Sequence, residues 1–360
     1  MKILFLGEIG AGQTSRMRMR AMARLGHAVQ GVNTVEPWRR GSWARRQLQR
    51  RLAVGSIVRD INKAALAAAR EMKPDLVWAE KQEFLWSDTV RSLRASGAKL
   101  IHFTPDPYFS LAWKRTRLMD AAIAEFDVLV YCKSYEAKNY QSTGKPTVYM
   151  PLGYCDEVHR PLPSADAQWN CRLGFLGGWE PRREHMLHVL AAGGLELKFR
   201  GYGWDFLRDG RWTLRRQIIL RQLAGGEPFR IHRDPLLAAA NMGGEVYDDD
   251  YARALTGAAI GLGFLRTICA DQHTTRTFEI PACGSMLLAD RTGEHREFFA
   301  EGREAEFFSS EQELLDKAGF YARNDDARRR IAHAGRQRCI DGRYAYIHRV
   351  DDALKAVAAT

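Results

Sequence analysis

Short apolar runs alternate with stretches of helical character along the first half of the chain. The first run, Lys2 to Gly7, is apolar at nearly every position, which is typical of a parallel strand buried on both faces. Strands are predicted at 2–7, 28–32, 74–79, 99–103, 126–131 and 147–150. Helices are predicted at 15–25, 57–72 and 86–96. This alternation predicts an open parallel sheet of the α/β, Rossmann-like class.

The alternation returns after a polar stretch that carries several prolines. Pro151, Pro161 and Pro163 interrupt the pattern, and we interpret residues 156–170 as a linker. Further strands are predicted at 171–176, 197–200, 258–265 and 286–289. We therefore expect one Rossmann-like domain at 1–155, a second at 171–342, and a C-terminal helix at 343–360. The arginine-rich segment 205–235 does not fit this plan and is interpreted as an insertion or an amphipathic helix.

Composition is that of a soluble globular protein. The chain has 360 residues, of which 46% are hydrophobic and 27% charged, and this length allows two domains. Residues 3–6 are too short for the apolar core of a signal peptide, and no run approaches the roughly 20 apolar residues of a membrane span. The six cysteines show no metal-binding spacing, so we expect reduced thiols in a cytoplasmic protein.

The net charge of +11 is concentrated in the first half of the chain. Residues 1–170 hold 26 Lys and Arg against 16 Asp and Glu, whereas residues 171–360 hold 28 against 27. Within the first half, residues 38–51 combine six arginines with Trp38 and Trp43 and contain no acid. This composition is typical of a segment that lies on an anionic membrane surface. A solvated helix face is the other interpretation.

A glycine-bearing loop follows the first strand. Gly10 and Gly12 could let a ligand approach closely, or they could simply form a tight turn. The spacing does not satisfy G-x-G-x-x-G, and no acidic residue ends the second strand, so a nicotinamide dehydrogenase is disfavoured. Because ligands bind at the carboxyl ends of parallel strands, polar residues at these ends are candidates for the site. They are Glu8, Glu80, Lys81, His102, Asp106 and Lys133.

The stretch from Asp271 to Ala289 carries the clearest chemistry. A polar run follows the strand at 258–265, and a helix is predicted to start near Thr274 or Thr275. The start of a helix after a strand favours phosphate, and Arg276 would add a full positive charge. Glu279 lies about one turn further along, where a carboxylate suits the two hydroxyls of a ribose. An ordinary strand, loop and helix with a surface glutamate is the alternative.

These residues resemble a known enzyme fold. The pattern Glu279-x-x-Ala282-x-Gly284, with Asp271 eight positions before Glu279, resembles the GT-B glycosyltransferases. The longer sequence from Arg276 to Gly284 is similar to the CgeB-like (spore-protein) glycosyltransferase family. The pair Asp106-Pro107 and the segment 151–154 are similar to that family as well. The resemblance implies a GT-B fold: two Rossmann-like domains that face a cleft, and a C-terminal helix that crosses back to the first domain.

The same resemblance implies an activity. It implies a hexosyltransferase-like enzyme that moves a sugar from a nucleotide-diphosphate sugar to a glycan, lipid-linked or protein acceptor, with no metal and no cofactor. Such a role belongs to polysaccharide or glycoconjugate biosynthesis. The basic segment 38–51 would then place the protein in the cytoplasm at the inner face of the membrane.

The resemblance also assigns roles. Asp271 would lie near the hydroxyls of the donor sugar. A base that activates the acceptor, needed only for an inverting reaction, would come from the first domain, where Asp106 is the first choice and Glu80 the second. The expected nucleotide-sugar site comprises Gly177, Gly178, Arg182, Gly201, Gly203, Thr274, Thr275, Arg276, Thr277 and Glu279.

Two other functions fit the same pattern. A nucleotide-sugar 2-epimerase uses this scaffold and would convert its nucleotide sugar without any acceptor. A non-catalytic protein could bind nucleic acid through the arginine-rich segments, but no helix-turn-helix, zinc or RNA-binding motif supports this function. The run Asp248-Asp249-Asp250 is interpreted as the charged start of a helix and not as a metal site.

Overall fold

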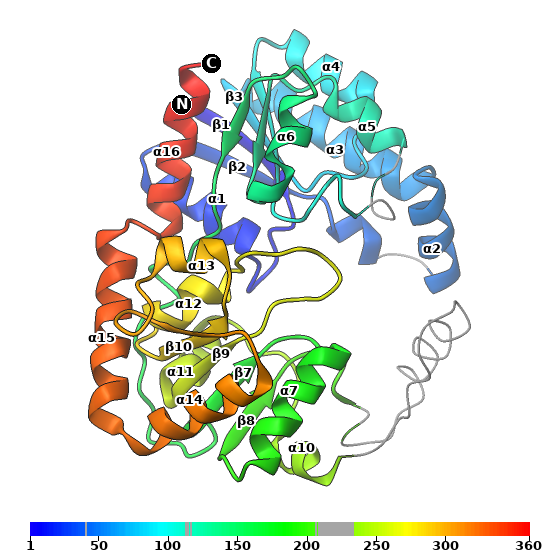
Figure 1. Cartoon of the computed structure of the whole chain (residues 1–360). Coiled ribbons are helices and arrows are strands. Elements are labelled where there is room, and N and C mark those ends of the chain that lie inside the picture. Colours follow the sequence, from blue (N-terminus) through cyan, green and yellow to red (C-terminus); the bar gives the residue numbers. More distant parts are fainter. Residues whose placement is uncertain (40–41, 112–114, 116, 206, 208–233) are drawn as a thin grey trace. The chain divides into compact units, whose positions relative to one another are not determined.

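The chain forms two compact units. The structure is a computed structural model that describes residues 1–39, 42–111, 115, 117–205, 207 and 234–360. The first unit comprises Met1–Cys155 and Tyr344–Thr360, and the second comprises Asp156–Arg343. Most of the arginine-rich segment predicted as an insertion or amphipathic helix, residues 206 and 208–233, lies outside the described residues. Figure 1 shows the elements of both units.

The first unit is built on a six-stranded parallel sheet in the order β2-β1-β3-β4-β5-β6. Its strands are β1 (Lys2–Gly7), β2 (Ala28–Asn33), β3 (Leu76–Glu80), β4 (Lys99–Thr104), β5 (Val128–Tyr131) and β6 (Thr147–Tyr149). Strand β3 is buried at every position, as its continuous apolar sequence predicts. The strand order reverses between β1 and β3, and such a switch point is where open α/β sheets bind ligands.

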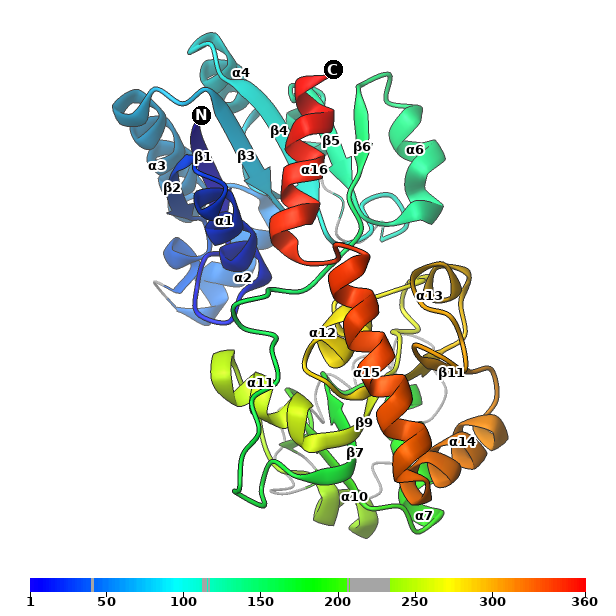
Figure 2. The same ribbon diagram turned by 90° about the vertical axis from the view of Figure 1, so that its left-hand side faces the viewer.

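Helices cover both faces of this sheet. They are α1 (Thr14–Arg24), α2 (Trp43–Leu52), α3 (Ser56–Met72), α4 (Ser87–Ala95), α5 (Arg117–Ile123), α6 (Ala137–Gln141) and α16 (Tyr346–Ala358), with 3₁₀ turns η1 (Glu36–Arg39) and η2 (Ser134–Glu136). Helices α1 and α16 lie side by side on one face, as Figure 2 shows. A buried cluster that includes Leu4, Ile61, Val77, Leu93 and Leu129 fills the space between sheet and helices.

The C-terminal helix is part of the first unit. The amide of Tyr346 donates to the carbonyl of Tyr154 at 2.7 Å, and the Lys99 ammonium donates to the carbonyl of Val357 at 2.6 Å. A side chain at Gly153 would place its Cβ 2.3 Å from the Tyr344 carbonyl oxygen. The contact therefore requires glycine at this position.

The second unit repeats the architecture with five parallel strands in the order β11-β10-β9-β7-β8. The strands are β7 (Cys171–Leu176), β8 (Leu197–Arg200), β9 (Ala258–Gly263), β10 (Met286–Asp290) and β11 (Glu306–Phe308). The helices are α7 (Pro181–Ala192), α10 (Pro235–Ala240), α11 (Asp248–Gly257), α12 (Arg276–Ala282), α13 (Gly293–Phe298), α14 (Glu311–Arg323) and α15 (Asp325–Asp341). The α/β prediction of two parallel sheets is confirmed.

The predicted linker is a packed part of the second unit. His159 and Trp169 are buried, and the amide of Leu162 donates to the Thr256 hydroxyl at 3.0 Å. The proline ring of Pro161 lies against Gly284. The prediction of a linker was wrong because prolines signal irregular backbone, which can be buried as well as exposed. None of the helices in the described part of the chain combines the length and the apolar sequence of a membrane span.

Candidate nucleotide-binding and acceptor sites

Four loops of the second unit meet at the carboxyl ends of its strands. They follow β7, β8, β9 and β10 and are tied together by hydrogen bonds that backbone amides donate to side-chain carboxylates and to a backbone carbonyl. The amide of Thr267 donates to Glu180 Oε2 at 3.2 Å, and that of Leu265 donates to Asp290 Oδ2 at 2.8 Å. The amide of Trp179 donates to the Tyr202 carbonyl at 3.0 Å. These bonds join the loops into one surface at the edge where parallel sheets bind ligands.

The predicted glycines allow two of these loops to pack in contact. Gly201 has φ +153°, and a Cβ there would lie 2.0 Å from the carbonyl oxygen of Gly177. A Cβ at Gly178 would lie 2.4 Å from the Tyr202 ring. Gly203 adopts a left-handed conformation with φ +83°. The structure therefore brings together all four glycines predicted for the nucleotide-sugar site, and no larger side chain fits at Gly178 or Gly201 without displacing a neighbour.

Arg183 is buried at the centre of this surface. Its guanidinium donates to the carbonyl oxygens of Gly178 at 3.0 Å and Phe264 at 3.1 Å. Burial, together with the positive charges of Arg276 and Arg266, lowers the pKa of Arg183 to about 10. The Nε atoms of Arg183 and Arg276 are both buried and form no hydrogen bond with a described residue. The site thus concentrates positive charge and contains guanidinium N–H groups without an acceptor among the described residues.

Arg182, and not its neighbour Arg183, was predicted from the sequence for this site. Arg182 pairs instead with the carboxylate of Asp290 at the end of β10. This ion pair secures the start of α7 to the strand, so Arg182 has a structural role. The sequence indicated that an arginine opens the helix after Gly178, but the direction of each side chain depends on the turn of α7.

Helix α12 begins at Arg276, close to the predicted start. Thr275 occupies the N-cap position in a helical conformation, and its side chain makes no capping hydrogen bond. The Thr277 hydroxyl instead accepts from the Thr274 amide at 3.1 Å and lies 2.9 Å from His295 Nε2. Thr275 therefore stands at the N-cap, within the predicted range, but its side chain does not cap the helix. The buried Thr277 side chain fixes the loop before the helix through its contacts with the Thr274 amide and His295.

Glu279 lies in a polar pocket formed by three elements. Its Oε2 accepts a 2.6 Å hydrogen bond from the Tyr251 hydroxyl of α11, and its Oε1 is 3.7 Å from His159 Nε2. Burial lowers the pKa of His159, so this ring is neutral at physiological pH. Burial and the Glu279 carboxylate raise the pKa of Tyr251 well above its usual value. Tyr251 and His159 were not predicted for the site, and only their positions in the fold reveal them.

Asp271 lies within the loop that follows β9. Its buried carboxylate is 3.3 Å from the Arg266 guanidinium. In the same loop, His273 pairs with Glu294 of α13, and the pKa of nearby His295 is lowered to about 4 by burial. The loop is thus held by buried polar contacts on both sides. The assignment of Asp271 to the hydroxyls of a donor sugar stays a prediction.

In the first unit, the two predicted bases have different surroundings. The buried carboxylate of Glu80 accepts from Arg18 through both oxygens and from the Ser15 hydroxyl at 2.6 Å. These bonds hold both carboxylate oxygens inside the unit, so we assign Glu80 a structural role and not that of the base. Asp106 is partly accessible, with 19% of its side chain exposed, and lies 2.9 Å from the Lys81 ammonium.

Two other strand-end candidates are part of the packed interior. His102 is buried and its ring lies 5.2 Å from the ring of Phe126, measured between centroids. Burial lowers the pKa of His102 to about 4. Lys133 is also buried. We therefore do not assign His102 or Lys133 to a ligand site.

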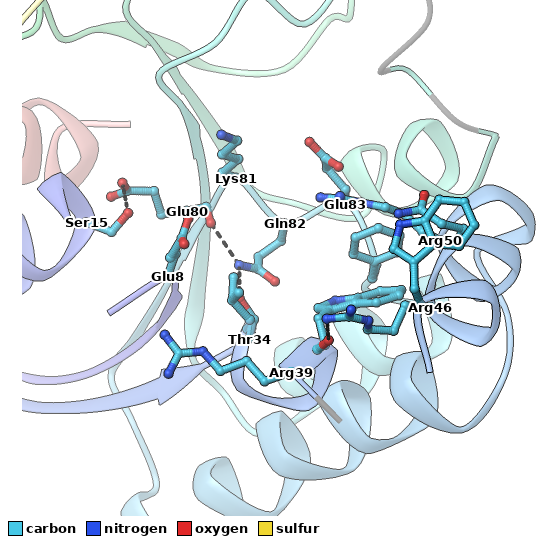
Figure 3. A pocket seen from close by; sticks show the side chains of 15 residues that line it. Glu8, Ser15, Thr34, Arg39, Arg46, Arg50, Glu80, Lys81, Gln82 and Glu83 are labelled. Carbon is cyan, nitrogen blue, oxygen red and sulfur yellow. Dashed lines mark hydrogen bonds between the residues drawn. The ribbon is translucent and has the colours of Figure 1, made fainter. Parts of the chain in front are cut away.

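The glycine loop after β1 is a tight turn. Gly12 has φ +71°, which favours glycine, whereas Gly10 would meet only ordinary contacts from a side chain. The loop leads past Glu8 to a cavity of about 390 Å³ at the switch point of the first sheet. Figure 3 shows the side chains that line it, among them Glu8, Thr34, Lys81 and Gln82. Thr34 and Gln82 were not predicted for the site.

No metal-binding cluster occurs in the described part of the chain: no three His, Cys, Asp or Glu side chains there are placed to hold an ion. The three consecutive aspartates begin helix α11, as predicted. Asp249 pairs with Arg160 at 3.3 Å, and Asp250 pairs with Arg253 at 2.7 Å.

A stretch that covers most of the second unit and part of helix α16 matches a known family model. Residues 182–355 match the model of a family described as glycosyl transferase-like. This range contains Arg183, Tyr251, Asp271, Arg276 and Glu279. No curated protein matches the chain at a significant level.

Solved structures match the chain over its whole length. HepE from Anabaena, in complex with UDP and glucose, is 14% identical over 100% of both chains, with a TM-score of 0.60. Sucrose-phosphate synthase from Thermosynechococcus elongatus is 12% identical over 100% of both chains, with a TM-score of 0.64. A protein from Listeria monocytogenes assigned as a UDP-N-acetylglucosamine 2-epimerase is 11% identical over 99% of this chain and 95% of that chain, with a TM-score of 0.57. The chain has the two-domain GT-B fold.

Proposed function

We propose that the protein is a glycosyltransferase that uses a nucleotide-diphosphate sugar as its donor. The observation that carries this proposal is the cluster of Arg183, Arg266 and Arg276 beside the glycine loops of the second unit. Arg266 already lies beside Asp271, and a diphosphate would add negative charge beside Arg183 and Arg276. Charge-assisted hydrogen bonds of this kind are among the strongest in proteins. The glycosyl transferase-like match over residues 182–355 supports the same function.

The arginine cluster suggests how the reaction is promoted. Negative charge grows on the nucleoside diphosphate as the sugar leaves, and fixed guanidinium groups stabilise that charge more strongly than they stabilise the bound donor. We therefore propose a metal-independent reaction. Arg276 and Arg183 would contact the diphosphate, and Glu279 would accept from the ribose hydroxyls with Oε1, the oxygen that does not accept from Tyr251. Asp271 would contact the donor sugar, which we propose is a hexose.

The first unit would bind the acceptor. Asp106 is the proposed base for an inverting reaction because its carboxylate is partly accessible, whereas Glu80 is held by Arg18. Acceptors of the glycan, lipid-linked and protein classes all suit this assignment. Within the glycosyltransferases, we propose the CgeB-like family, on the sequence from Arg276 to Gly284.

Helix α2 supports a proposed location at the inner face of the cytoplasmic membrane. None of its residues is buried, and Leu48 and Leu52 are 60% and 58% exposed. Arg45 precedes these leucines in the sequence, and Arg51 lies between them. Exposed apolar side chains with adjacent arginines favour an anionic membrane surface.

Analysis of reaction products tests the proposal. The full chain is incubated in EDTA with a panel of nucleotide sugars, with and without a glycan acceptor. Release of the nucleoside diphosphate, increased by an acceptor, is the expected result. A sugar epimer formed without an acceptor would favour the 2-epimerase, which the similarity to the Listeria monocytogenes protein keeps as the second candidate. Turnover of no donor would contradict both functions.

A further inference from the structure

The cavity of the first unit has a basic end and an acidic end. It lies where the loops after β1, β2 and β3 diverge, with helix α2 forming one wall (Figure 3). Trp43, Arg46, Gln47 and Arg50 line this wall. Their spacing of three, four and seven residues places them on one face of the helix. The opposite wall carries Glu8 and Glu80.

Helix α2 is positioned by residues on its other side. Arg45 donates to the Ser56 hydroxyl at 2.8 Å, and the Gln49 side chain accepts from the Ile57 amide at 2.9 Å. These bonds attach α2 to the start of α3. The helix contributes no buried residue to the core of the unit. Its cavity-facing side chains are therefore not needed for core packing.

The charges at the acidic end are compensated within the protein. Glu80 is paired with Arg18. Burial opposes the charge of Lys81, but Asp106, Glu83 and Glu8 together raise its pKa above the usual value. The Glu80 carboxylate is therefore paired with Arg18, and the Glu8 and Glu83 carboxylates lie near the Lys81 ammonium.

The basic end differs, because its arginines are not paired with a carboxylate of the described part of the chain. Arg46 donates to the Trp38 carbonyl at 3.3 Å, and its Nε is buried without a hydrogen-bond partner among the described residues. Neither Arg46 nor Arg50 forms an ion pair with any residue that the structure describes. The cavity is also lined by Glu8, Glu80 and Glu83. Arg46 and Arg50, one turn apart on the same helix face and outside any ion pair with a described residue, still match the geometry of a phosphate.

Aromatic side chains lie next to these arginines. The rings of Trp38 and Phe84 are 4.7 Å apart between centroids, and both line the cavity. Trp43 lines it too, although 69% of this residue is exposed. Aromatic faces provide apolar area against which a sugar ring or an alkyl chain can pack.

We propose that this cavity binds an acceptor that carries a phosphate group. The phosphate lies between Arg46 and Arg50, the adjoining sugar or alkyl portion packs on Trp38 and Trp43, and hydroxyls extend toward Glu8. The assignment rests on the proposed function, because it specifies the acceptor class of that reaction. A free sugar phosphate and a lipid phosphate present the same chemistry to the arginines.

Binding experiments on the full chain test this site. UDP is added first at saturating concentration, so that the second unit cannot take up the probe. Glucose 1-phosphate is then titrated by calorimetry as the soluble probe. Vesicles of phosphatidylcholine containing phosphatidic acid form the lipid arm, and phosphatidylserine vesicles of equal charge are the comparison. The arm that binds identifies the source of the phosphate.

The variants are Arg46→Ala and Arg50→Ala, with Arg59→Ala on α3 as a matched control. Arg59 is exposed and does not line the cavity. Each cavity variant should weaken binding of one of the two phosphate probes by about tenfold or more, while Arg59→Ala leaves it unchanged. Arg50→Ala guards against misfolding because Arg50 is exposed and forms no ion pair with a described residue.

Two outcomes would overturn the inference. One is the absence of binding in both arms, and the other is equal binding by the wild type and both cavity variants. UDP affinity is measured in the same samples. If UDP binds normally and the phosphate probes fail, the acceptor site is wrong but the proposed function stands. If the probes bind in the predicted way and UDP does not, the proposed function fails and the anion site stands.

Discussion

The hydroxyl of Tyr251 donates a 2.6 Å hydrogen bond to the carboxylate of Glu279. This contact joins helix α11 to helix α12. It fixes one carboxylate oxygen of Glu279, the side chain that we propose binds the ribose. A fixed carboxylate loses little side-chain entropy when it binds hydroxyl groups. The orientation of Glu279 therefore depends on a tyrosine 28 residues earlier in the chain.

Replacing the ribose ligand should weaken nucleotide binding. Glu279→Gln should reduce the affinity for UDP by about 1–3 kcal/mol, the range for hydrogen bonds to a charged group. Tyr251→Phe should also reduce it, because the carboxylate loses its fixed orientation. Calorimetry on the folded variants measures both effects. Glu311→Gln, at an exposed position of α14, is the control, and unchanged affinity in Glu279→Gln would remove Glu279 from the site.

Metal independence predicts activity in EDTA. Arg276→Ala should reduce turnover more than it reduces folding stability, because the charge that Arg276 meets grows during the reaction. The measurement is donor turnover in EDTA beside a thermal melt of the same variant. Loss of wild-type activity in EDTA, with recovery on addition of Mg²⁺ or Mn²⁺, would refute this part of the mechanism.

The ion pair of Glu80 and Arg18 should be important for folding. Glu80→Gln leaves the buried Arg18 guanidinium without its counter-charge, which typically costs about 3–5 kcal/mol. Asp106→Asn should cost less than about 1 kcal/mol, because its Lys81 partner is 43% exposed. Urea unfolding of both variants compares them. Similar stability losses would show that Glu80 is not the structural residue that we describe.

Buried histidines should make the protein sensitive to acid. The pKa of His102 in the folded state is about 4, below the 6.5 of an unfolded histidine, and burial is the main cause. Between these values the unfolded chain binds a proton that the folded chain does not, so stability falls as the pH drops below about 6.5. The loss from His102 between pH 7 and pH 5 is roughly 2 kcal/mol.

Urea unfolding at pH 7 and pH 5 measures this effect. His102→Leu should remove part of the pH dependence, and His295, whose pKa is also lowered to about 4 by burial, should account for a further part. An unchanged pH dependence in His102→Leu would contradict a neutral, buried His102.

Association with membranes should depend on the outer side of α2. Arg51→Glu and Leu52→Ser should each weaken co-sedimentation with vesicles that contain phosphatidylserine, and salt should weaken it too, since each basic residue near an anionic surface adds about 1 kcal/mol. Neither residue lines the cavity of the first unit. Equal recovery with neutral and anionic vesicles at low salt would exclude this location for the protein.

The sequence predicted the sheets well because parallel strands buried on both faces leave continuous apolar runs. Such a run, β3, is completely buried. Glycines at 201 and 178 were predicted for the site, and the structure gives the reason in the close packing of two loops.

The polar contacts were less predictable because they join residues far apart in the chain. Arg182 was chosen for the phosphates, but it pairs with Asp290, 108 residues away, while Arg183 is the buried member of the cluster. Glu80 was chosen as a base, but Arg18, 62 residues away, holds it. Such partners become visible only when the fold brings them together.

The arginine cluster of the second unit should bind a diphosphate. Calorimetry with UDP and with uridine, on the wild type, Arg276→Ala and the exposed control Arg329→Ala, tests it most directly. UDP should bind more tightly than uridine, and Arg276→Ala should remove about 1.5–3 kcal/mol of that preference while Arg329→Ala leaves it intact. Equal affinity for UDP and uridine, or an unchanged preference in Arg276→Ala, would contradict the claim.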